Sequence, residues 1–240
     1  MRRSLLNYLF IGMCLISGAL FAQGTDCEND VRKFYKQRAS VSLDQGYYIK
    51  YGVQTIYKDK SFSSKEMLFT MMYKDYQLHV LSDVLNTYAD TNTVISVSKL
   101  TKKIVVGSNT KAQFSKMLNN SSQLSDSLLW KNFDVSSCKA IDGHKEYNHE
   151  VVLQAKKTNT EVRQISYLYN QQSSALYKVT NKYSKSAQLE ELNYFFYKID
   201  YEYNGSDLKS KTITSLFFDG KGKLLPAYAG YELIDQRNKK

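Results

Sequence analysis

Histidine serves most often for proton transfer and metal binding near neutral pH, and this chain has three histidines. His144 and His149 stand with Glu146 in one short segment, which combines residue types that can bind a metal. Zinc motifs on a helix place two histidines four residues apart, whereas these are five apart at a predicted strand edge. We interpret this segment as a solvated hairpin and predict no metal site. His79 lies in an apolar predicted strand, which is typical of a structural histidine.

Paired carboxylates are the second arrangement that could support catalysis. They occur at Glu190-Glu191 and at Asp200 and Glu202. Hydrolysis by two carboxylates needs them opposed across a cleft, but Asp200 and Glu202 share one outer face of a predicted strand. The sequence also contains no serine nucleophile elbow, no phosphate-binding glycine loop and no cysteine with a plausible base. We therefore predict no catalytic residues, no enzyme and no cofactor.

The charge balance is basic, with 33 Lys and Arg against 23 Asp and Glu and a formal net charge of +10. Nucleic-acid-binding proteins concentrate such charge, whereas these lysines are spread over turns and strand ends. They include Lys99, Lys102, Lys103, Lys111, Lys156, Lys157, Lys209, Lys211, Lys221, Lys223, Lys239 and Lys240. Lysines at such positions protect sheet edges against aggregation and are also attracted to anionic membranes. We expect no nucleic-acid partner, and we keep a solubilising surface and an anionic membrane surface as alternatives.

The first 22 residues have the three parts of an export signal. Arg2 and Arg3 precede an apolar run from Leu5 to Phe21, and small residues follow near Ala22. We predict cleavage after Ala22, which leaves residues 23–240 as a single soluble domain in the periplasm. Lipid attachment is disfavoured, because the residues before the cysteines are not the small apolar ones of a lipid-transfer signal.

Cleavage leaves Cys27 and Cys138 as the remaining cysteines, in an oxidising compartment that favours disulfides. A bond between them would close a loop of about 110 residues and stabilise the fold by about 4–5 kcal/mol. Spacing alone does not give the distance between two Cα atoms. The sequence is therefore compatible both with this disulfide and with two buried thiols.

The elements that would position these groups begin with a helix. Thr25-Asp26-Cys27-Glu28 has the form of a capping box, and Cys27, Val31 and Phe34 form an apolar stripe. This pattern predicts a helix over about 26–39. A second helical region, Asn109 to Trp130, is interrupted at Asn119 to Ser122 and predicts two short helices.

The rest of the chain alternates apolar and polar residues with a period of two, which is typical of strands. Between Gly46 and Val106 the runs are joined by short turns. In the second half they are Val135–Ile141, Tyr147–Lys156, Glu161–Tyr169, Ala175–Tyr183, Leu192–Tyr203, Ser210–Phe218 and Lys223–Ile234. Such short connections predict antiparallel pairing. We predict a mainly β (α+β) fold: a curved antiparallel sheet or incomplete barrel of about 10–12 strands, with the helices on its concave face.

This order of elements resembles the periplasmic outer-membrane lipoprotein carrier (LolA/LolB-like) fold family. The likeness is one of overall pattern over about residues 26–234. It is carried mainly by the region from Tyr48 to Val106, including the early strand Gly52-Val53-Gln54-Thr55-Ile56-Tyr57. The resemblance implies an incomplete barrel closed by helices over an apolar cavity that takes acyl chains. No position matches the functional arginine of the family, so no residue role is carried over.

Flexible and bulky apolar residues supply the candidate ligand-binding set. They lie on one predicted strand and on the helical insert: Met67, Phe69, Met71, Tyr73, Phe114, Met117, Leu118 and Leu128. Methionine adapts to ligands without a fixed outline, but the same residues also fill ordinary cores, so a cavity and a packed core are both compatible.

The resulting hypothesis is a non-catalytic carrier in the cell envelope whose partner is a lipid or a lipidated protein. The alternative is an envelope scaffold that docks another envelope protein through Tyr-rich strands and basic turns.

Overall fold

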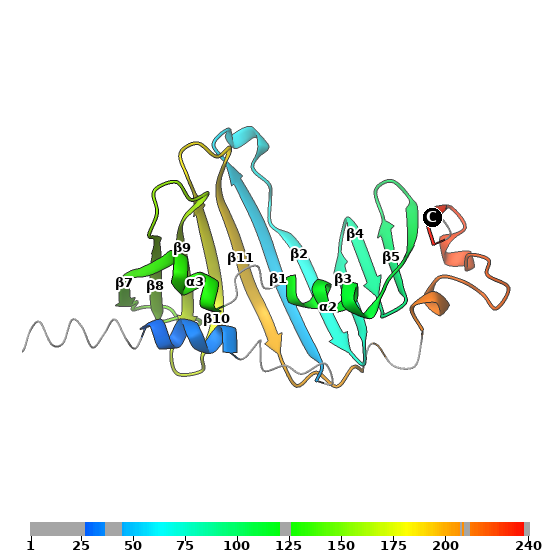
Figure 1. Cartoon of the computed structure of the whole chain (residues 1–240), viewed down its shortest axis with the longest axis horizontal. Helices are drawn as coiled ribbons and strands as arrows, with labels where there is room; N and C mark the ends of the chain where they lie inside the picture. Colours follow the sequence, from blue (N-terminus) through cyan, green and yellow to red (C-terminus); the bar gives the residue numbers. More distant parts are fainter. Residues whose placement is uncertain (1–26, 37–44, 121–125, 207, 209–211, 238–240) are drawn as a thin grey trace, which may run out of the picture.

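The computed structural model describes residues 27–36, 45–120, 126–206, 208 and 212–237. The predicted signal peptide and Thr25 lie outside these residues. The described chain forms one open sheet of twelve strands in the order β12-β6-β5-β4-β3-β2-β1-β11-β10-β9-β8-β7 (Figure 1). Every neighbouring pair is antiparallel except β12 and β6, which run parallel. The prediction of an antiparallel sheet of about 10–12 strands is confirmed.

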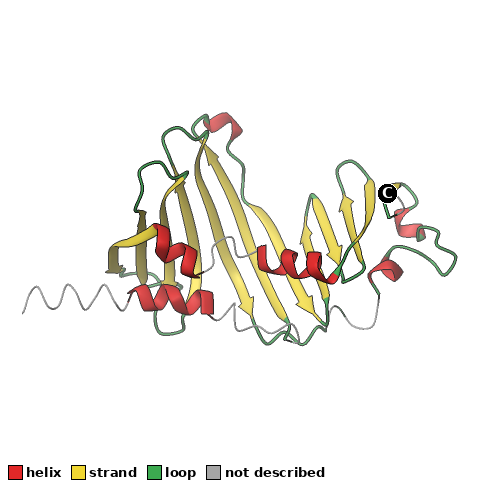
Figure 2. Ribbon diagram, viewed as in Figure 1, coloured by secondary structure: helices red, strands yellow, loops and turns green. Residues whose placement is uncertain are grey.

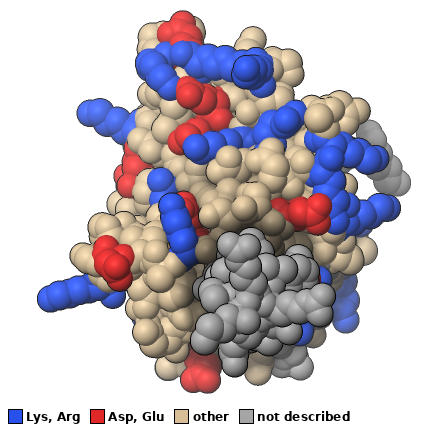
Figure 3. Space-filling model, turned by 90° about the vertical axis from the view of Figure 1, so that its left-hand side faces the viewer, with Lys and Arg blue, Asp and Glu red and all other residues tan. Residues whose placement is uncertain are grey.

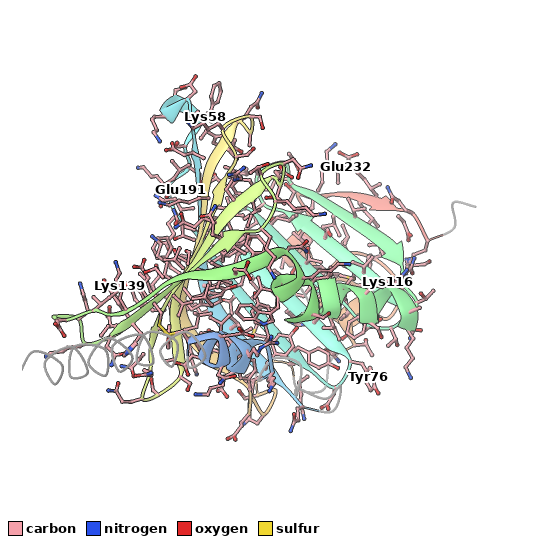
Figure 4. All side chains as sticks on the ribbon, turned by 60° about the vertical axis from the view of Figure 1, so that its left-hand side comes forward. Lys58, Tyr76, Lys116, Lys139, Glu191 and Glu232 are labelled. Atoms are coloured by element: carbon pink, nitrogen blue, oxygen red, sulfur yellow. A yellow bond between two sulfur atoms is a disulfide. The ribbon has the colours of Figure 1, made fainter. Side chains whose placement is uncertain are left out.

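The strands follow the alternating segments of the sequence. Their bounds are β1 Tyr47–Tyr57, β2 Met67–Lys74, β3 Gln77–Ser82, β4 Leu85–Ala89, β5 Thr93–Ser98, β6 Lys103–Ser108, β7 Phe133–Ala140, β8 His149–Ala155, β9 Val162–Asn170, β10 Ala175–Tyr183, β11 Leu189–Asp200 and β12 Glu232–Asp235. In Figure 4, β7–β10 are seen nearly edge-on while β3–β6 show their face, so the sheet is strongly twisted. Such twist is the normal right-handed tendency of neighbouring strands.

The predicted helices are present. Residues 27–36 form the described part of the N-terminal helix, and the insert forms α2 (Lys111–Asn120) and α3 (Asp126–Asn132). Among the described residues, no helix combines the length and the apolar character needed to cross a membrane.

These helices lie on the same face of the sheet (Figure 2). Phe114 of α2 packs against Tyr73, whereas Val31 of the N-terminal helix packs in a cluster with Tyr167. Residues paired across an antiparallel ladder point to the same side. Following the register from β2 through β1, β11 and β10 to β9 therefore places Tyr73 and Tyr167 on one face.

Two strands were predicted near the C-terminus, but the described residues there form only the short strand β12. The described part of Ser210–Phe218 contains a 3-10 helix, η2 (Ile213–Leu216), and Lys223–Ile234 contains η3 (Pro226–Tyr228) followed by the short β12. Pro226 fits the first turn of η3, since a proline there has no N–H that needs a partner. Ile213 and Phe217 are fully buried against Ile95, Val97, Ile104 and Val106, which point away from the face that carries the helices. The apolar residues of this segment therefore cover the opposite face of the sheet instead of extending it.

Candidate ligand-binding groove

The candidate ligand-binding residues predicted from the sequence do not come together in one site in the structure. Tyr73 and Phe114, each 1% exposed, form a packed cluster together with Met71, Met117 and Leu118. Phe69 instead stacks on Tyr51, with 5.4 Å between ring centroids. Met67 and Leu128 are exposed, at 38% and 48%. The region beneath α2 is therefore a filled core where these side chains meet.

The open space lies elsewhere on the same face, beside the N-terminal helix. A disulfide joins Cys27 of this helix to Cys138 of β7, with 6.3 Å between the Cα atoms and 111 residues of separation. Val31 is fully buried, and the ring of Phe34 packs edge-on against Tyr169 at 5.2 Å between centroids. The helix is thus held to the sheet by a covalent bond and by its apolar stripe.

Two polar contacts fix the same helix further. The hydroxyl of Tyr169 donates to Asp30 Oδ2 at 2.9 Å, and Lys33 Nζ donates to Asp30 Oδ1 at 2.8 Å. Burial raises the pKa of Asp30, but the hydrogen bonds from Lys33 and Tyr169 outweigh it, so the pKa of this carboxyl is lowered. The hydroxyls of Tyr35 and Tyr167 lie 2.8 Å apart. Burial raises the pKa of Tyr167 well above its usual value, which keeps that hydroxyl neutral.

The sheet itself parts beside this helix. The ladder between β10 and β11 runs from the Lys182–Glu191 pair to the Lys178–Phe195 pair and ends there. Beyond that point Ala175 and Leu176 pair only with β9, and Phe196 and residues 198–200 pair only with β1. Tyr177 and Tyr197 are bulged residues at the point of parting, since each is skipped in the register with the neighbouring strand. Bulges increase local twist, which explains why the two strands turn away from each other here.

A groove of about 800 Å³ occupies the space between the N-terminal helix and the parted strands. Its walls are mainly apolar: Phe34, Ile49, Leu176, Val179, Phe196 and Ile199. Polar groups line it as well, namely Glu146, Ser173, Ser174 and Lys198, together with the rings of Tyr35, Tyr167, Tyr177, Tyr197 and Tyr201. The volume lies within the range of about 300–1,000 Å³ that is typical of small-molecule sites. An apolar interior with a few polar groups suits an amphipathic ligand.

Of the groups considered for catalysis or metal binding, Glu146 lines this groove, whereas His144, His149, Glu190 and Asp200 are not among its lining residues. His144 stacks on Tyr147 at 4.4 Å between ring centroids, and His149 Nδ1 lies 2.9 Å from Asn148 Oδ1. Glu190 pairs with Lys60, and Asp200 accepts a hydrogen bond from the backbone N–H of Glu202 at 3.0 Å. Within the described ranges, no group of three or more His, Cys, Asp or Glu residues could hold a metal ion.

One acidic contact borders the groove. Tyr197 donates its hydroxyl to Glu66, and this hydrogen bond, with a smaller effect of burial, raises the pKa of Tyr197 to about 12. A tyrosine with a raised pKa stays protonated near neutral pH.

The sequence contained part of the signal for this groove. Phe34 lies on the predicted stripe of the N-terminal helix, and Ile49 lies on the alternating face of β1. Strict alternation along β11 would place Phe195, Tyr197 and Ile199 on one face. The bulge at Tyr197 instead puts Phe196 and Ile199 on the groove side and Phe195 on the other face. The adjacent aromatics Phe195 and Phe196, which break the alternation, were the available sign.

No protein-family model matches the chain, and no curated protein matches it in sequence. Among solved structures it is similar to an uncharacterized conserved protein from Thermus thermophilus, with a TM-score of 0.43, 6% identity, and coverage of 86% of this chain and 99% of that one. It is also similar to the Pseudomonas aeruginosa MucA/MucB complex, with a TM-score of 0.41 and 10% identity. That match covers 83% of this chain but only 63% of the other, so the chain spans less than two thirds of its length.

A LolA superfamily protein from Nitrosomonas europaea is also among the structural neighbours, with a TM-score of 0.29, 9% identity, and coverage of 75% of this chain and 97% of that one. The fold family that the sequence resembles is thus represented among them. All these TM-scores lie below 0.5, so these similarities do not assign a function to the chain.

Proposed function

We propose that this protein is an exported, non-catalytic binding protein of the cell envelope that holds a lipid acyl chain, free or attached to a lipoprotein, in the groove beside its N-terminal helix. The observation that carries the proposal is the groove itself, an apolar space of about 800 Å³ that a disulfide-anchored helix walls on one side. The export signal predicted in the sequence supports the location. The oxidised cysteine pair agrees with it, because disulfides persist mainly outside the cytoplasm.

The energetics favour a flexible apolar chain as the ligand. Each methylene group that leaves water contributes about 0.8 kcal/mol, so the gain increases with the length of the buried chain. Leu176, Val179 and Ile199 offer contacts that do not depend on a fixed ligand outline. The carboxylate of Glu146 can meet the polar end of such a ligand.

One observation favours a second candidate, an envelope scaffold that docks a partner protein. Residues 175–177 and 196–200 each lack a strand partner on the side where β10 and β11 part. Open strand edges accept extended peptides through backbone hydrogen bonds. A peptide could therefore enter the same groove as an added strand.

A groove-filling variant tests the ligand proposal. Ala175 is exposed and lines the groove, so Ala175→Trp adds bulk there without removing any packed side chain. We expect it to weaken the binding of a fluorescent fatty acid at least tenfold, as measured by titration. Ala140→Trp is the matched control, because Ala140 is exposed on β7 and does not line the groove. Equal affinity of both variants and the wild type would refute the groove as the lipid site.

Native mass spectrometry of protein purified from its own host, together with hydrogen exchange, separates the two candidates. Acyl cargo should appear as a recurrent lipid mass. A docked peptide should instead protect the amides of residues 196–200, which a lipid would leave unpaired. Recovery without lipid, combined with no fatty acid uptake, would exclude the carrier.

A further inference from the structure

The turns at the two ends of the strands form two edges of the sheet, and these edges differ in charge. Because the strands alternate in direction, the turns 58–66, 83–84, 99–102, 156–161 and 184–188 lie along one edge, the upper one in Figure 1, which we call the basic edge. Its basic residues are Lys58, Lys60, Lys65, Lys99, Lys102, Lys156, Lys157 and Lys185, against Asp59, Glu66, Asp83 and Glu161. The described turns of the opposite, acidic edge carry Asp75, Asp90, Asp142, Glu146 and Glu202, against Lys145. The described turns thus carry an excess of basic residues at one edge and an excess of acidic residues at the other.

This polarity is not obvious from every side. On the face seen in Figure 3, basic and acidic side chains both occur, and no single patch dominates. Several lysines of the basic edge also have partners: Lys60 pairs with Glu190, and Lys156 lies 3.1 Å from Asp134. Exposed ion pairs of this kind are weak, and with these two acidic partners counted, the eight lysines of the edge face six acidic residues, so an excess of positive charge remains.

Exposed apolar side chains gather at the same edge. Leu100, 74% exposed, and Phe62, 71% exposed, are the most exposed large apolar side chains in the described part of the chain. Each stands at a hairpin tip between lysines, Phe62 between Lys60 and Lys65 and Leu100 between Lys99 and Lys102. Leu85, Leu68 and Met67 are also exposed near this edge. Single exposed apolar residues are ordinary, but a group of them that alternates with lysines marks an interaction surface.

The tip that carries Phe62 is held in a defined shape. Asp59 caps the 3-10 helix η1 (Lys60–Phe62) by accepting from the backbone N–H of Ser61 at 3.0 Å. Ser63 Oγ accepts from the N–H of Tyr57 at 3.0 Å, and Ser64 Oγ accepts from the N–H of Thr55 at 2.9 Å. The N–H groups of Phe62, Ser63 and Ser64 also donate to backbone carbonyls, while the Phe62 side chain is exposed. An ordered loop loses little further conformational entropy when its tip binds to another surface.

The tip that carries Leu100 is organised in the same way. The N–H of Lys99 donates to the carbonyl of Val84 at 2.9 Å, and Lys99 Nζ donates to the carbonyl of Ser82 at 2.7 Å. The N–H of Thr101 donates to Ser98 Oγ at 3.2 Å. These bonds tie the β5–β6 turn to the neighbouring β3–β4 turn and leave the Leu100 side chain at the apex.

We infer that the basic edge docks the protein on an anionic lipid bilayer, with Phe62 and Leu100 inserted into the interface and the flanking lysines against the headgroups. Apolar burial and the surface potential of anionic lipids act together in this mode of binding. Two separated tips can rest on one plane, since the line between them can lie parallel to the bilayer. The inference is independent of the ligand proposed for the groove.

Vesicle flotation tests this docking. Wild-type protein should float with vesicles of equal parts phosphatidylglycerol and phosphatidylcholine, and much less with pure phosphatidylcholine. The double variant Phe62→Ser/Leu100→Ser should bind about tenfold or more weakly, since two apolar insertions are lost. Tyr76→Ser removes an exposed apolar side chain from the acidic edge and is the matched control, with binding as in the wild type. Failure of the wild type to bind, or an equal loss in the control, would overturn the inference.

Two further measurements test whether the tips insert and whether the groove contributes to vesicle binding. With Phe62→Trp or Leu100→Trp, anionic vesicles should shift the added tryptophan emission to the blue, whereas Tyr76→Trp should show no shift. Absence of the shift at both tips would overturn the insertion. The groove-filling Ala175→Trp variant should bind vesicles as well as the wild type does. A loss of vesicle binding in that variant would assign it to lipid uptake by the groove and overturn docking through the edge.

Discussion

The two halves of the sheet carry helices on the same face, yet the described side chains pack differently beneath them. Over β2–β4, α2 places Phe114 against Tyr73 and Leu78, and the contact is filled. Over β8–β11, the N-terminal helix stands beside strands that part below the Lys178–Phe195 pair, and a groove remains. The difference shows that ligand space in this fold depends on where neighbouring strands separate, and not only on where a helix covers the sheet.

The means of attachment differ as well. α2 is held by the apolar packing of its own cluster, whereas the N-terminal helix is joined to β7 by a disulfide and to β9 by the Asp30–Tyr169 hydrogen bond. The N-terminal helix thus has a covalent and a polar attachment in addition to the packing of Val31 and Phe34.

Removal of the disulfide should give the largest effect and should act on the groove half. With Cys27→Ala/Cys138→Ala, the free energy of unfolding should fall by about 4–5 kcal/mol, because the bond closes a long loop. Urea unfolding of the variant and of the reduced wild type measures this loss. Fatty acid affinity should fall too, since one wall of the groove loosens. Unchanged affinity would show that the covalent attachment is not needed for the groove.

The Phe114→Ala variant should affect the opposite half and should leave the ligand bound. Truncation of a fully buried phenylalanine leaves a cavity, and the expected loss of stability is about 3–4 kcal/mol. Fatty acid affinity should stay as in the wild type. Leu128→Ala, at an exposed position, is a control that should change stability by less than about 0.5 kcal/mol. A drop in affinity with Phe114→Ala would instead support the binding site beneath α2 that the sequence predicted.

His79 should give the smallest of these effects. It should make the free energy of unfolding depend on pH, through the half of the sheet that carries α2. Burial lowers the pKa of His79 to about 4, and its Nε2 has no hydrogen-bond partner among the described residues. The His79 side chain becomes protonated near pH 6.5 in the unfolded chain, but only near pH 4 in the folded chain. Stability is therefore complete above about pH 6.5 and should decrease by about 2–3 kcal/mol as the pH falls to about 4.

His79→Phe should remove this part of the pH dependence while keeping an aromatic ring beside Tyr88. Urea midpoints of the wild type and the variant at several pH values provide the test. Parallel curves for the two proteins would contradict the assignment to His79.

The sequence predicted the elements better than it predicted the site. Alternation over Tyr47–Tyr57 and the stripe of Val31 and Phe34 were enough for the strand and the helix, because both are local patterns. The groove depends on a bulge at Tyr177 and another at Tyr197, which change lateral pairing and leave little trace in a single sequence. The strands predicted in the C-terminal segment failed for a related reason. Its apolar residues, such as Phe217, bury themselves against the back of the sheet rather than in a ladder.

The bond between Cys27 and Cys138 also sets an order of events in the proposed export. One cysteine enters the new compartment early, while the other follows 111 residues later, so the wall of the groove can lock only after more than half of the mature chain has crossed and met an oxidant. Cargo uptake should consequently trail thiol oxidation. Trapping of free thiols in newly secreted chains, followed by analysis of their bound lipid, would reveal whether loaded molecules are always the oxidised ones.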